Sequence, residues 1–162
     1  NGPFDGDPEK PGVSWASHPK GEVPEGYYTV PLGSAEIALP GEELTVVTYG
    51  TLVHVAIAAA KETGVDCEVI DVRTMAPLDV KTLTDSVKKT GRCLIAHEAT
   101  RFGGYGAELA ATIHKDCFYH LEAPIGRVAG WDTPYPHAFE WQYSPGLKRL
   151  SAGIRRVMGV TA

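Results

Sequence analysis

Apolar residues along this chain fall into short β-branched runs separated by longer stretches with a helical period. The runs are typical of strands, since each is short and bounded by glycine or polar residues: residues 44–49, 67–72, 93–96 and about 127–129. Stretches with apolar residues three and four positions apart are typical of helices: residues 51–63, 79–89 and from about 107 onward. This alternation predicts parallel strands joined by helical crossovers, with helices on both faces of the sheet.

Two of the predicted helices carry a clear start signal. Asp79 precedes a helical stretch and is a good N-terminal cap. Ser144 followed by Pro145 predicts the start of a last helix, whose apolar face continues to Val157. These patterns together predict an α/β fold, a three-layer α/β/α domain over residues 34–162 with a mostly parallel five-stranded sheet.

Residues 1–33 differ in composition from the rest of the chain, and this composition predicts a linker arm. They hold six of the twelve prolines and six of the eighteen glycines, with no apolar periodicity. Residues 27–30, Tyr-Tyr-Thr-Val, are the only strand-like stretch, and we expect them to supply an antiparallel edge strand. Because the chain starts at Asn1 in a polar, turn-rich segment, we expect it to be part of a longer protein.

Composition narrows the classes of partner. The formal net charge is −5, the wrong sign for a protein that neutralises many phosphates, so we expect no nucleic-acid partner. The sequence has neither a long apolar run nor a basic segment followed by an apolar one, so we expect no membrane span and no signal peptide. Three widely spaced cysteines are typical of reduced core thiols, which indicates a reducing compartment: Cys67, Cys93 and Cys117.

The glycine-rich residues 103–106 stand before a predicted helix, where backbone amides and the helix dipole favour an anion. Their spacing matches neither a dinucleotide fingerprint nor a P-loop. We therefore favour a tight strand-to-helix turn over a phosphate site.

Four histidines, His54, His97, His114 and His120, are candidates for chemistry. His97 and Glu98 follow a predicted strand, where α/β sheets place functional groups, yet neighbours on a strand point to opposite faces. We therefore favour a buried polar or interface contact over a general acid–base pair. His114, Cys117 and His120 lack the further ligands of a metal site, and we expect no metal. His54 lies in an apolar helical stretch, so we expect it in the core.

The segment after the last predicted strand places five aromatic side chains in thirteen residues without a regular period. A loop this apolar must cover its own core or meet another chain, and Trp and Tyr dominate interfaces. We favour a subunit interface over an internal lid. The predicted interface residues are His97, Glu98, Trp131, Asp132, Thr133, Pro134, Tyr135 and Pro136; Phe139, Trp141 and Tyr143 follow them.

Seven motifs occur in the order found in the beta subunits of thiamine-diphosphate-dependent 2-oxo acid dehydrogenases, which this chain closely resembles over residues 22–162. They are residues 44–51, 68–79, 89–92, 97–99, 103–108, 121–125 and 132–136. The resemblance covers the C-terminal, transketolase-C-like domain of that subunit. Residues 2–6, 15–19 and 23–28 look most like the bacterial branched-chain enzymes, with pyruvate and acetoin dehydrogenases as alternatives.

The resemblance implies a place in a heterotetramer with an alpha subunit and a second beta subunit. Thiamine diphosphate and magnesium would bind outside this chain, which would hold no catalytic, cofactor-binding or metal-binding residue. The subunit-binding domain of a dihydrolipoyl acyltransferase would dock on a Leu-Glu-Ala-Pro-Ile element, here near Glu122 and Arg127. Some relatives have a second acid where this chain has Gly126.

Two other readings stay open on the residues alone. One is a flavodoxin-like module that binds phosphate or a nucleotide at residues 103–106. The other is the equivalent domain of a transketolase or a deoxyxylulose phosphate synthase, in which the preceding domains lie on the same chain.

Overall fold

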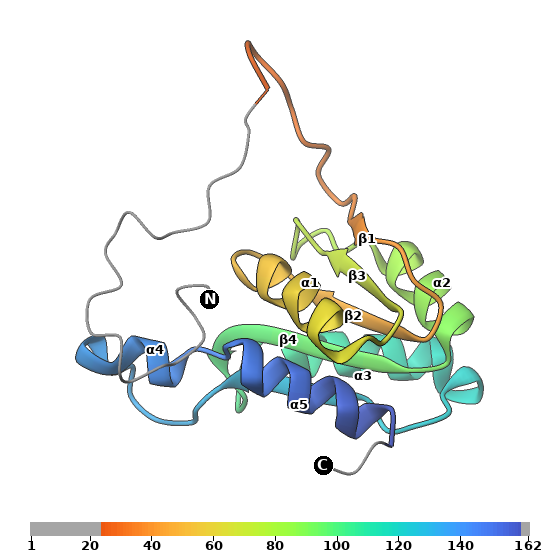
Figure 1. The fold of residues 1–162 in the computed structure, drawn as a ribbon. Helices are drawn as coiled ribbons and strands as arrows, with labels where there is room; N and C mark the ends of the chain where they lie inside the picture. Colours follow the sequence, from red (N-terminus) through yellow and green to blue (C-terminus); the bar gives the residue numbers. More distant parts are fainter. Residues whose placement is uncertain (1–23, 160–162) are drawn as a thin grey trace.

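A five-stranded sheet forms the centre of the molecule, in the order β1-β3-β2-β4-β5 (Figure 1). The computed structural model describes residues 24–159, without the side chain of Trp141. The strands are β1 (Glu36–Leu39), β2 (Leu44–Thr48), β3 (Cys67–Asp71), β4 (Cys93–Thr100) and β5 (Gly126–Gly130). β1 runs antiparallel to β3, and the other neighbours are parallel. The predicted fold class is therefore confirmed.

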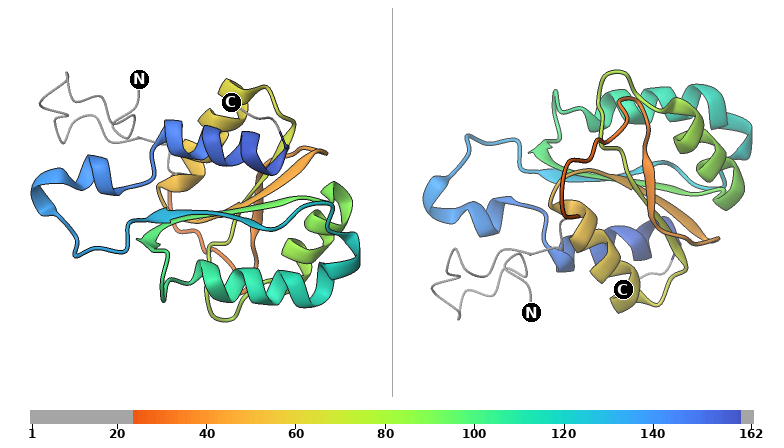
Figure 2. Two further views of the ribbon diagram at one scale, coloured as in Figure 1. Left: turned by 90° about the horizontal axis from the view of Figure 1, so that it is seen from below. Right: turned by 90° about the horizontal axis from the view of Figure 1, so that it is seen from above.

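Helices cover both faces of this sheet (Figure 2). They are α1 (Leu52–Thr63), α2 (Val80–Thr90), α3 (Gly106–Cys117), α4 (Glu140–Tyr143) and α5 (Leu147–Val157), with short 3-10 turns at η2 (Phe118–His120) and η3 (His137–Phe139). α1 and α5 lie on one face, and α2 and α3 lie on the other. No helix between residues 24 and 159 is both long enough and apolar enough to cross a membrane.

Each face of the sheet has its own hydrophobic core. Strand alternation sends Val46 toward α1 and α5 and its neighbour Val47 toward α2 and α3. The predicted core thiols are confirmed, since Cys67 lies in the first core and Cys93 and Cys117 lie in the second, all free. Burying an aliphatic side chain contributes roughly 1.5–3 kcal/mol, so these two clusters hold the layers together.

Polar groups inside the α2 layer are satisfied by partners. The Thr45 hydroxyl lies 2.7 Å from the Ser86 hydroxyl and 2.8 Å from that of Thr90. The Glu68 carboxylate is almost fully buried and accepts a 2.6 Å hydrogen bond from Lys89 Nζ. Such pairing offsets the cost of placing hydroxyls and a carboxylate between a strand and a helix.

The predicted edge strand at residues 27–30 is wrong. These residues form no strand and are exposed; the antiparallel edge strand is β1, nine residues further along. The apolar alternation at 27–30 has no free edge to pair with, because β1 already occupies the outer edge of β3. The side chains of Tyr27 and Tyr28 are left in solvent.

The start of the last helix was predicted two residues too early. Ser144 closes α4 instead, because its N–H donates to the carbonyl of Glu140 at 2.8 Å. α5 begins after Gly146, which has an extended backbone. A short helix thus precedes the long one, where the sequence pattern indicated an irregular loop.

His54 was expected in the core and is exposed instead. α1 buries a stripe that includes Leu52, Val55 and Ala59, and His54 lies outside this stripe. An alanine-rich helix looks apolar on nearly all sides, so its sequence does not mark which side faces the sheet.

Two segments extend beyond the body formed by the sheet and its helices. One is the described part of the arm, residues 24–33, at the top of Figure 1. The other is the segment from residue 131 to residue 146, called here the aromatic projection, which carries α4 at the left of that view. Both segments expose large apolar side chains to solvent.

Candidate functional site

The carboxyl ends of β2 and β4 form a topological switch point. β2 leads through α1 to β3 on one side, and β4 leads through α3 to β5 on the other. In open α/β sheets the crevice outside such strand ends is the usual place for ligands. Tyr49 and Thr51 follow β2 there, and Glu98 lies near the end of β4.

A hydrogen bond closes this switch point. The hydroxyl of Thr51, at the start of α1, donates to the carboxylate of Glu98 across the two strands. Tyr49 follows the same strand as Thr51, and burial, together with the charge of Glu98, raises the pKa of its hydroxyl. The phenol therefore stays protonated at neutral pH.

His97 lies on the opposite face from Glu98, as strand alternation predicts. Its ring is fully buried and lies parallel to that of Tyr49, with centroids 6.3 Å apart. A Cβ at Gly106 would lie 2.3 Å from His97 Nε2, and one at Gly104 would lie 2.8 Å from Cε1. The ring therefore fills the space that side chains at these positions would need.

This packing explains the glycine-rich residues 103–106. Gly103 has φ of 69°, a left-handed conformation that favours glycine, and Gly104 and Gly106 let the start of α3 approach His97. The interpretation as a tight turn is confirmed. A catalytic pair of His97 and Glu98 is not assembled, because the two side chains lie on different faces of the sheet.

Arg149 of α5 holds the aromatic projection against the sheet. Its guanidinium donates to the carbonyl of Tyr143 at 3.0 Å and to the carbonyl of Ala129. The same group lies 4.3 Å from the ring centroid of Trp131, a cation–π contact. Trp131 Nε1 in turn donates to the carbonyl of Gln142 at 3.1 Å, so both ends of the projection are tied together.

The tip of the projection is organised by Tyr135. Its ring packs edge-on against that of Tyr143, with the ring centroids 5.1 Å apart. Its hydroxyl donates a 2.8 Å hydrogen bond to the carboxylate of Glu140. Tyr143 is buried above Gly130, where a Cβ would lie 2.7 Å from its ring. Yet 55% of Trp131 and 47% of Tyr135 stay exposed. The projection is thus a structured surface with an apolar side toward solvent.

The other predicted interface residues lie on the same surface. Asp132 accepts a 2.7 Å hydrogen bond from the N–H of Phe102, which ties the loop after β4 to the projection. Thr133 and Pro134 are exposed, and Pro136 is half-buried. Of the predicted set, only His97 is wholly internal.

The predicted acyltransferase-docking residues do not converge. Glu122 precedes β5 at the amino end of the sheet, where its carboxylate lies 3.3 Å from Arg92 Nε. Arg127 instead donates to the carbonyl of Arg101, beyond the carboxyl end of β4. Gly126 lies under α5, because a Cβ there would lie 2.5 Å from Val157 Cγ2, which leaves no room for an acid.

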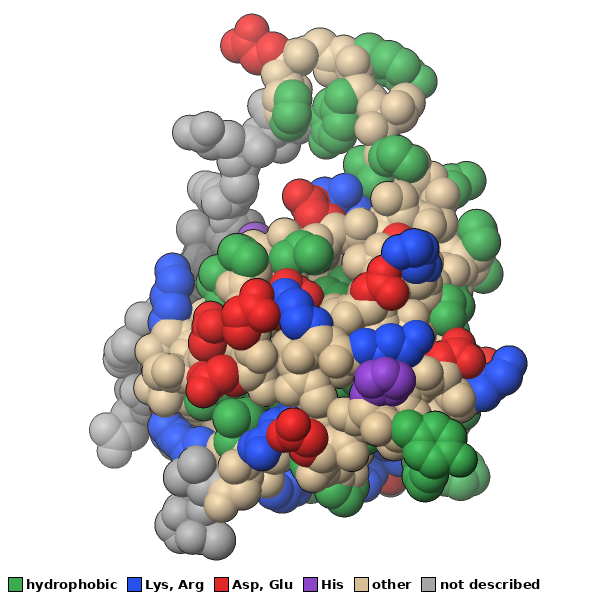
Figure 3. Space-filling view, turned by 90° about the vertical axis from the view of Figure 1, so that its right-hand side faces the viewer, with side chains coloured by type: hydrophobic (Ala, Val, Ile, Leu, Met, Phe, Trp, Pro, Cys, Tyr) green, Lys and Arg blue, Asp and Glu red, His purple; other side chains and the backbone are tan. Residues whose placement is uncertain are grey.

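The amino end of the sheet, where Glu122 lies, is rich in charge. Figure 3 faces this side, with acidic side chains gathered around a few basic ones across the middle. Lys89 bridges Glu42 and Glu68 there. This end therefore differs in character from the carboxyl end, where the aromatic projection lies.

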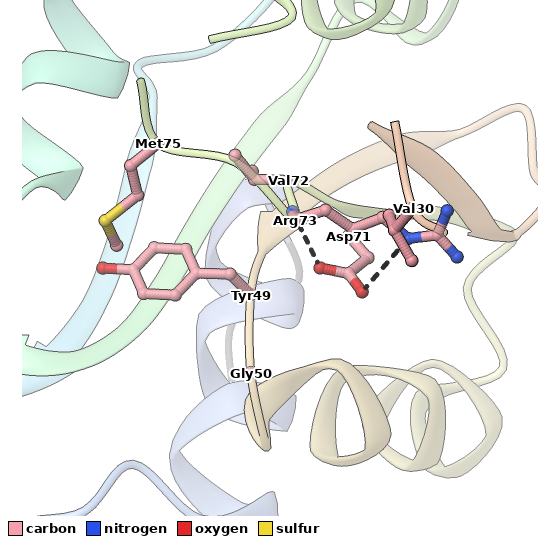
Figure 4. Close-up of a pocket in the computed structure, with 7 residues that line it drawn as sticks. All are labelled: Val30, Tyr49, Gly50, Asp71, Val72, Arg73 and Met75. Atoms are coloured by element: carbon pink, nitrogen blue, oxygen red, sulfur yellow. Dashed lines mark hydrogen bonds and ion pairs between the residues drawn. The ribbon is translucent and has the colours of Figure 1, made fainter. Parts of the chain in front are cut away.

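One open pocket of about 530 Å³ lies at the carboxyl ends of β2 and β3 (Figure 4). It is lined by Val30, Tyr49, Gly50, Asp71, Val72, Arg73 and Met75. Arg73 has a positive φ of 56° and pairs with Glu36 and Asp71.

The residues that the structure describes do not fit a diphosphate with its metal ion. Among residues 24–159, no three His, Cys, Asp or Glu side chains lie close enough to hold a metal. The glycines before α3, the best-placed anion cradle, face the ring of His97 instead.

Sequence reasoning missed Arg149 and Thr51. Arg149 is one of four cations on the last helix, with Lys148, Arg155 and Arg156. Nothing in its spacing distinguishes it, since its partners are backbone carbonyls and a ring from other elements. Thr51 was taken only as the first residue of a helix.

Comparison with known families matches residues 33–150 to the family described as Transketolase, C-terminal domain. The chain belongs to this family. Curated relatives carry the same domain in longer chains. The 2-oxoisovalerate dehydrogenase subunit beta of Pseudomonas aeruginosa is 61% identical over 99% of this chain and 46% of its own length. The 3-methyl-2-oxobutanoate dehydrogenase subunit beta of Mycobacterium tuberculosis is 44% identical over 87% of this chain and 42% of its own.

Comparison with solved structures supports the fold. A split-gene transketolase, described as an inactive beta4 tetramer, matches with a TM-score of 0.70 at 21% identity, over 89% of this chain and 47% of that one. At this identity the match bears on the fold alone. The chain spans about half the length of the relatives it matches.

Replacing Arg149 with alanine should loosen the aromatic projection and destabilise the domain. The change removes two hydrogen bonds and the contact with Trp131, so the free energy of unfolding should fall by about 1–3 kcal/mol. Urea denaturation measures this. Arg156→Ala, at an exposed position on the same helix, is the matched control and should change stability by less than about 0.5 kcal/mol. Equal effects of both variants would contradict the role given to Arg149.

His97 should make stability depend on pH. Burial is the main cause that lowers the pKa of His97 below 6.5, and the charge of Arg127 acts in the same direction. The unfolded chain therefore binds a proton at this residue at higher pH than the folded chain does. Stability should fall as the pH drops below about 6.5 and level off below the folded-state pKa, by at most about 1.4 kcal/mol per pH unit.

Urea denaturation between about pH 7.5 and pH 5.5 tests this expectation, a range that lies mostly above carboxylate titration. His97→Gln should flatten the dependence. His120→Gln, at an exposed position, should leave it unchanged. A His97→Gln variant that keeps the full slope would assign the effect to another group.

Proposed function

We propose that this chain is the C-terminal part of the beta subunit of a branched-chain 2-oxo acid dehydrogenase, with 3-methyl-2-oxobutanoate as a substrate of the whole enzyme. The observation that carries the proposal is the 61% identity to a 2-oxoisovalerate dehydrogenase beta subunit across 99% of this chain. Two further relatives with that subunit name are 46% and 45% identical. Residues 34–162 would form one domain, preceded by the linker arm of residues 1–33.

The domain would act in assembly. The aromatic projection with Glu98 would contact another subunit, either the alpha subunit or a second beta subunit. Exposed Trp131 and Tyr135, held in place by Arg149 and Tyr143, support this, because rigid aromatic groups are the common anchors of interfaces.

The acyltransferase would dock at the opposite end of the sheet. Glu122 is 64% exposed in its side chain and lies at the amino end of the sheet, a side of the molecule that carries several acidic side chains (Figure 3), which suits a basic binding domain. Gly126 is fixed by Val157, and Arg127 is directed toward the loop after β4. We therefore assign the docking role to Glu122 and the structural roles to the other two.

Thiamine diphosphate and magnesium would bind on parts of the enzyme outside this chain, since the described residues do not fit them. The bacterial cytoplasm is the compartment we infer. Three buried free thiols and a relative from Pseudomonas support it.

The longer beta chain, purified with its alpha subunit and the acyltransferase, tests this function. With thiamine diphosphate and magnesium, it should decarboxylate 3-methyl-2-oxobutanoate and acylate the lipoyl group at least about tenfold more efficiently than with pyruvate, where tenfold corresponds to 1.4 kcal/mol of discrimination. The 162-residue chain alone is the negative control. A preference for pyruvate would contradict the assignment of 3-methyl-2-oxobutanoate as the substrate. Turnover by the 162-residue chain alone would overturn the whole proposal.

Reversing the charge of Glu122 should weaken acyltransferase capture. Because the carboxylate is mostly exposed and already paired with Arg92, Glu122→Lys should cost about 1 kcal/mol at low salt, roughly fivefold in the dissociation constant, and less as salt is added. Titration calorimetry with the isolated subunit-binding domain measures it. Glu108→Lys, on exposed α3, is the control. An unchanged affinity at low salt would remove Glu122 from the docking surface.

A further inference from the structure

Most of the exposed large hydrophobic side chains lie at the carboxyl ends of the strands. They come from the arm and from the loops after β3, β4 and β5, and include Tyr27, Leu32, Met75, Phe102, Trp131 and Tyr135. Apolar patches of this extent are uncommon on a protein that works alone. The proposed subunit contact of the aromatic projection explains the exposed side chains near β5. The exposed side chains near the arm still lack a role.

The arm has a fixed place at this edge. Glu36 pairs with Asp71, the last residue of β3, and β1 is antiparallel, so the residues before Glu36 lie beyond the carboxyl end of β3. The N–H of Ala35 donates to the Asp79 carboxylate at 3.0 Å, and Gly33 lies against Pro77. The direction in which the chain enters the domain is therefore set by contacts.

The pocket lies at the foot of this arm. Val30 of the arm forms one side, while Tyr49 and Met75 approach each other at the far side (Figure 4). The charged groups on the rim already have partners, because Arg73 pairs with both Asp71 and Glu36. An apolar surface whose charged groups are already paired suits an apolar occupant better than a charged one.

We infer that arm residues 27–32 and this pocket form the docking face for the residues that precede this chain in the longer beta subunit. The inference rests on the proposed function. The relatives are about twice as long as this chain. A longer beta subunit would therefore contain a further part, about as large as this chain, that needs a surface to pack against.

Covalent attachment favours this occupant over a second copy. The arm enters the domain beside the pocket, so residues joined to it are present at an effective concentration in the millimolar range. A second copy would first lose translational and rotational freedom to reach the same face.

Hydrogen–deuterium exchange of the longer beta chain, compared with the 162-residue chain, tests the inference. Peptides covering residues 27–32 should exchange at least about tenfold more slowly in the longer chain, at a dilution where sedimentation shows a monomer and without the alpha subunit. Equal exchange in both chains, or slow exchange only after dimerisation or addition of alpha subunit, would overturn it.

Leu32→Asp supplies a second measurement. Leu32 is 82% exposed here, so the variant should leave the melting temperature of the 162-residue chain unchanged and lower that of the longer chain by several degrees. Tyr119→Asp, at a position that is 94% exposed, is the control and should affect neither chain. A Leu32→Asp variant without effect on the longer chain would contradict the docking face.

Activity of the same preparations separates the two proposals. A longer chain that supports turnover of 3-methyl-2-oxobutanoate but gives no protection at residues 27–32 would overturn the docking inference alone. A protected chain whose complex prefers another oxo acid would overturn the substrate assignment alone.

Discussion

Close approach of three glycines to bulky side chains is the constraint on which the architecture depends. The ring of His97 packs against Gly106 at the start of α3. Val157 of α5 packs against Gly126, and Tyr143 of the projection packs against Gly130. In each case a Cβ would lie within 3 Å of a packed side chain. Because protein interiors leave no spare volume, these positions set how near each helix lies to the sheet.

The two ends of the sheet have developed different surfaces from this shared scaffold. At the amino end lie ion pairs such as Lys89 with Glu68 and Arg92 with Glu122. At the carboxyl end, the loops after the strands carry exposed aromatic and aliphatic groups. Two surfaces of different chemistry, held apart by the length of the strands, suit two different partners. This separation agrees with a proposed role in assembling a multienzyme complex.

The groups that first suggest catalysis have structural partners. His97 is buried against glycine backbone and Tyr49, while Glu98 accepts a hydrogen bond from Thr51 on the other face. The guanidinium of Arg149 donates hydrogen bonds to two carbonyls and makes a cation–π contact with a tryptophan ring. These contacts stiffen the carboxyl edge and give the projection a definite shape. For a docking surface, such rigidity limits the entropy lost on binding.

The sequence by itself determined the α/β alternation, the cap at Asp79, the core thiols and the separation of His97 from Glu98, because local periodicity and strand alternation govern each of these. It misplaced the edge strand, the start of α5 and the side of α1 that carries His54. Only the tertiary structure decided that Arg149 anchors the projection, that His97 sits under Gly106, and that Glu122 and the aromatic groups lie at opposite ends of the sheet. Those outcomes depend on contacts between residues distant in the chain, which no local pattern records.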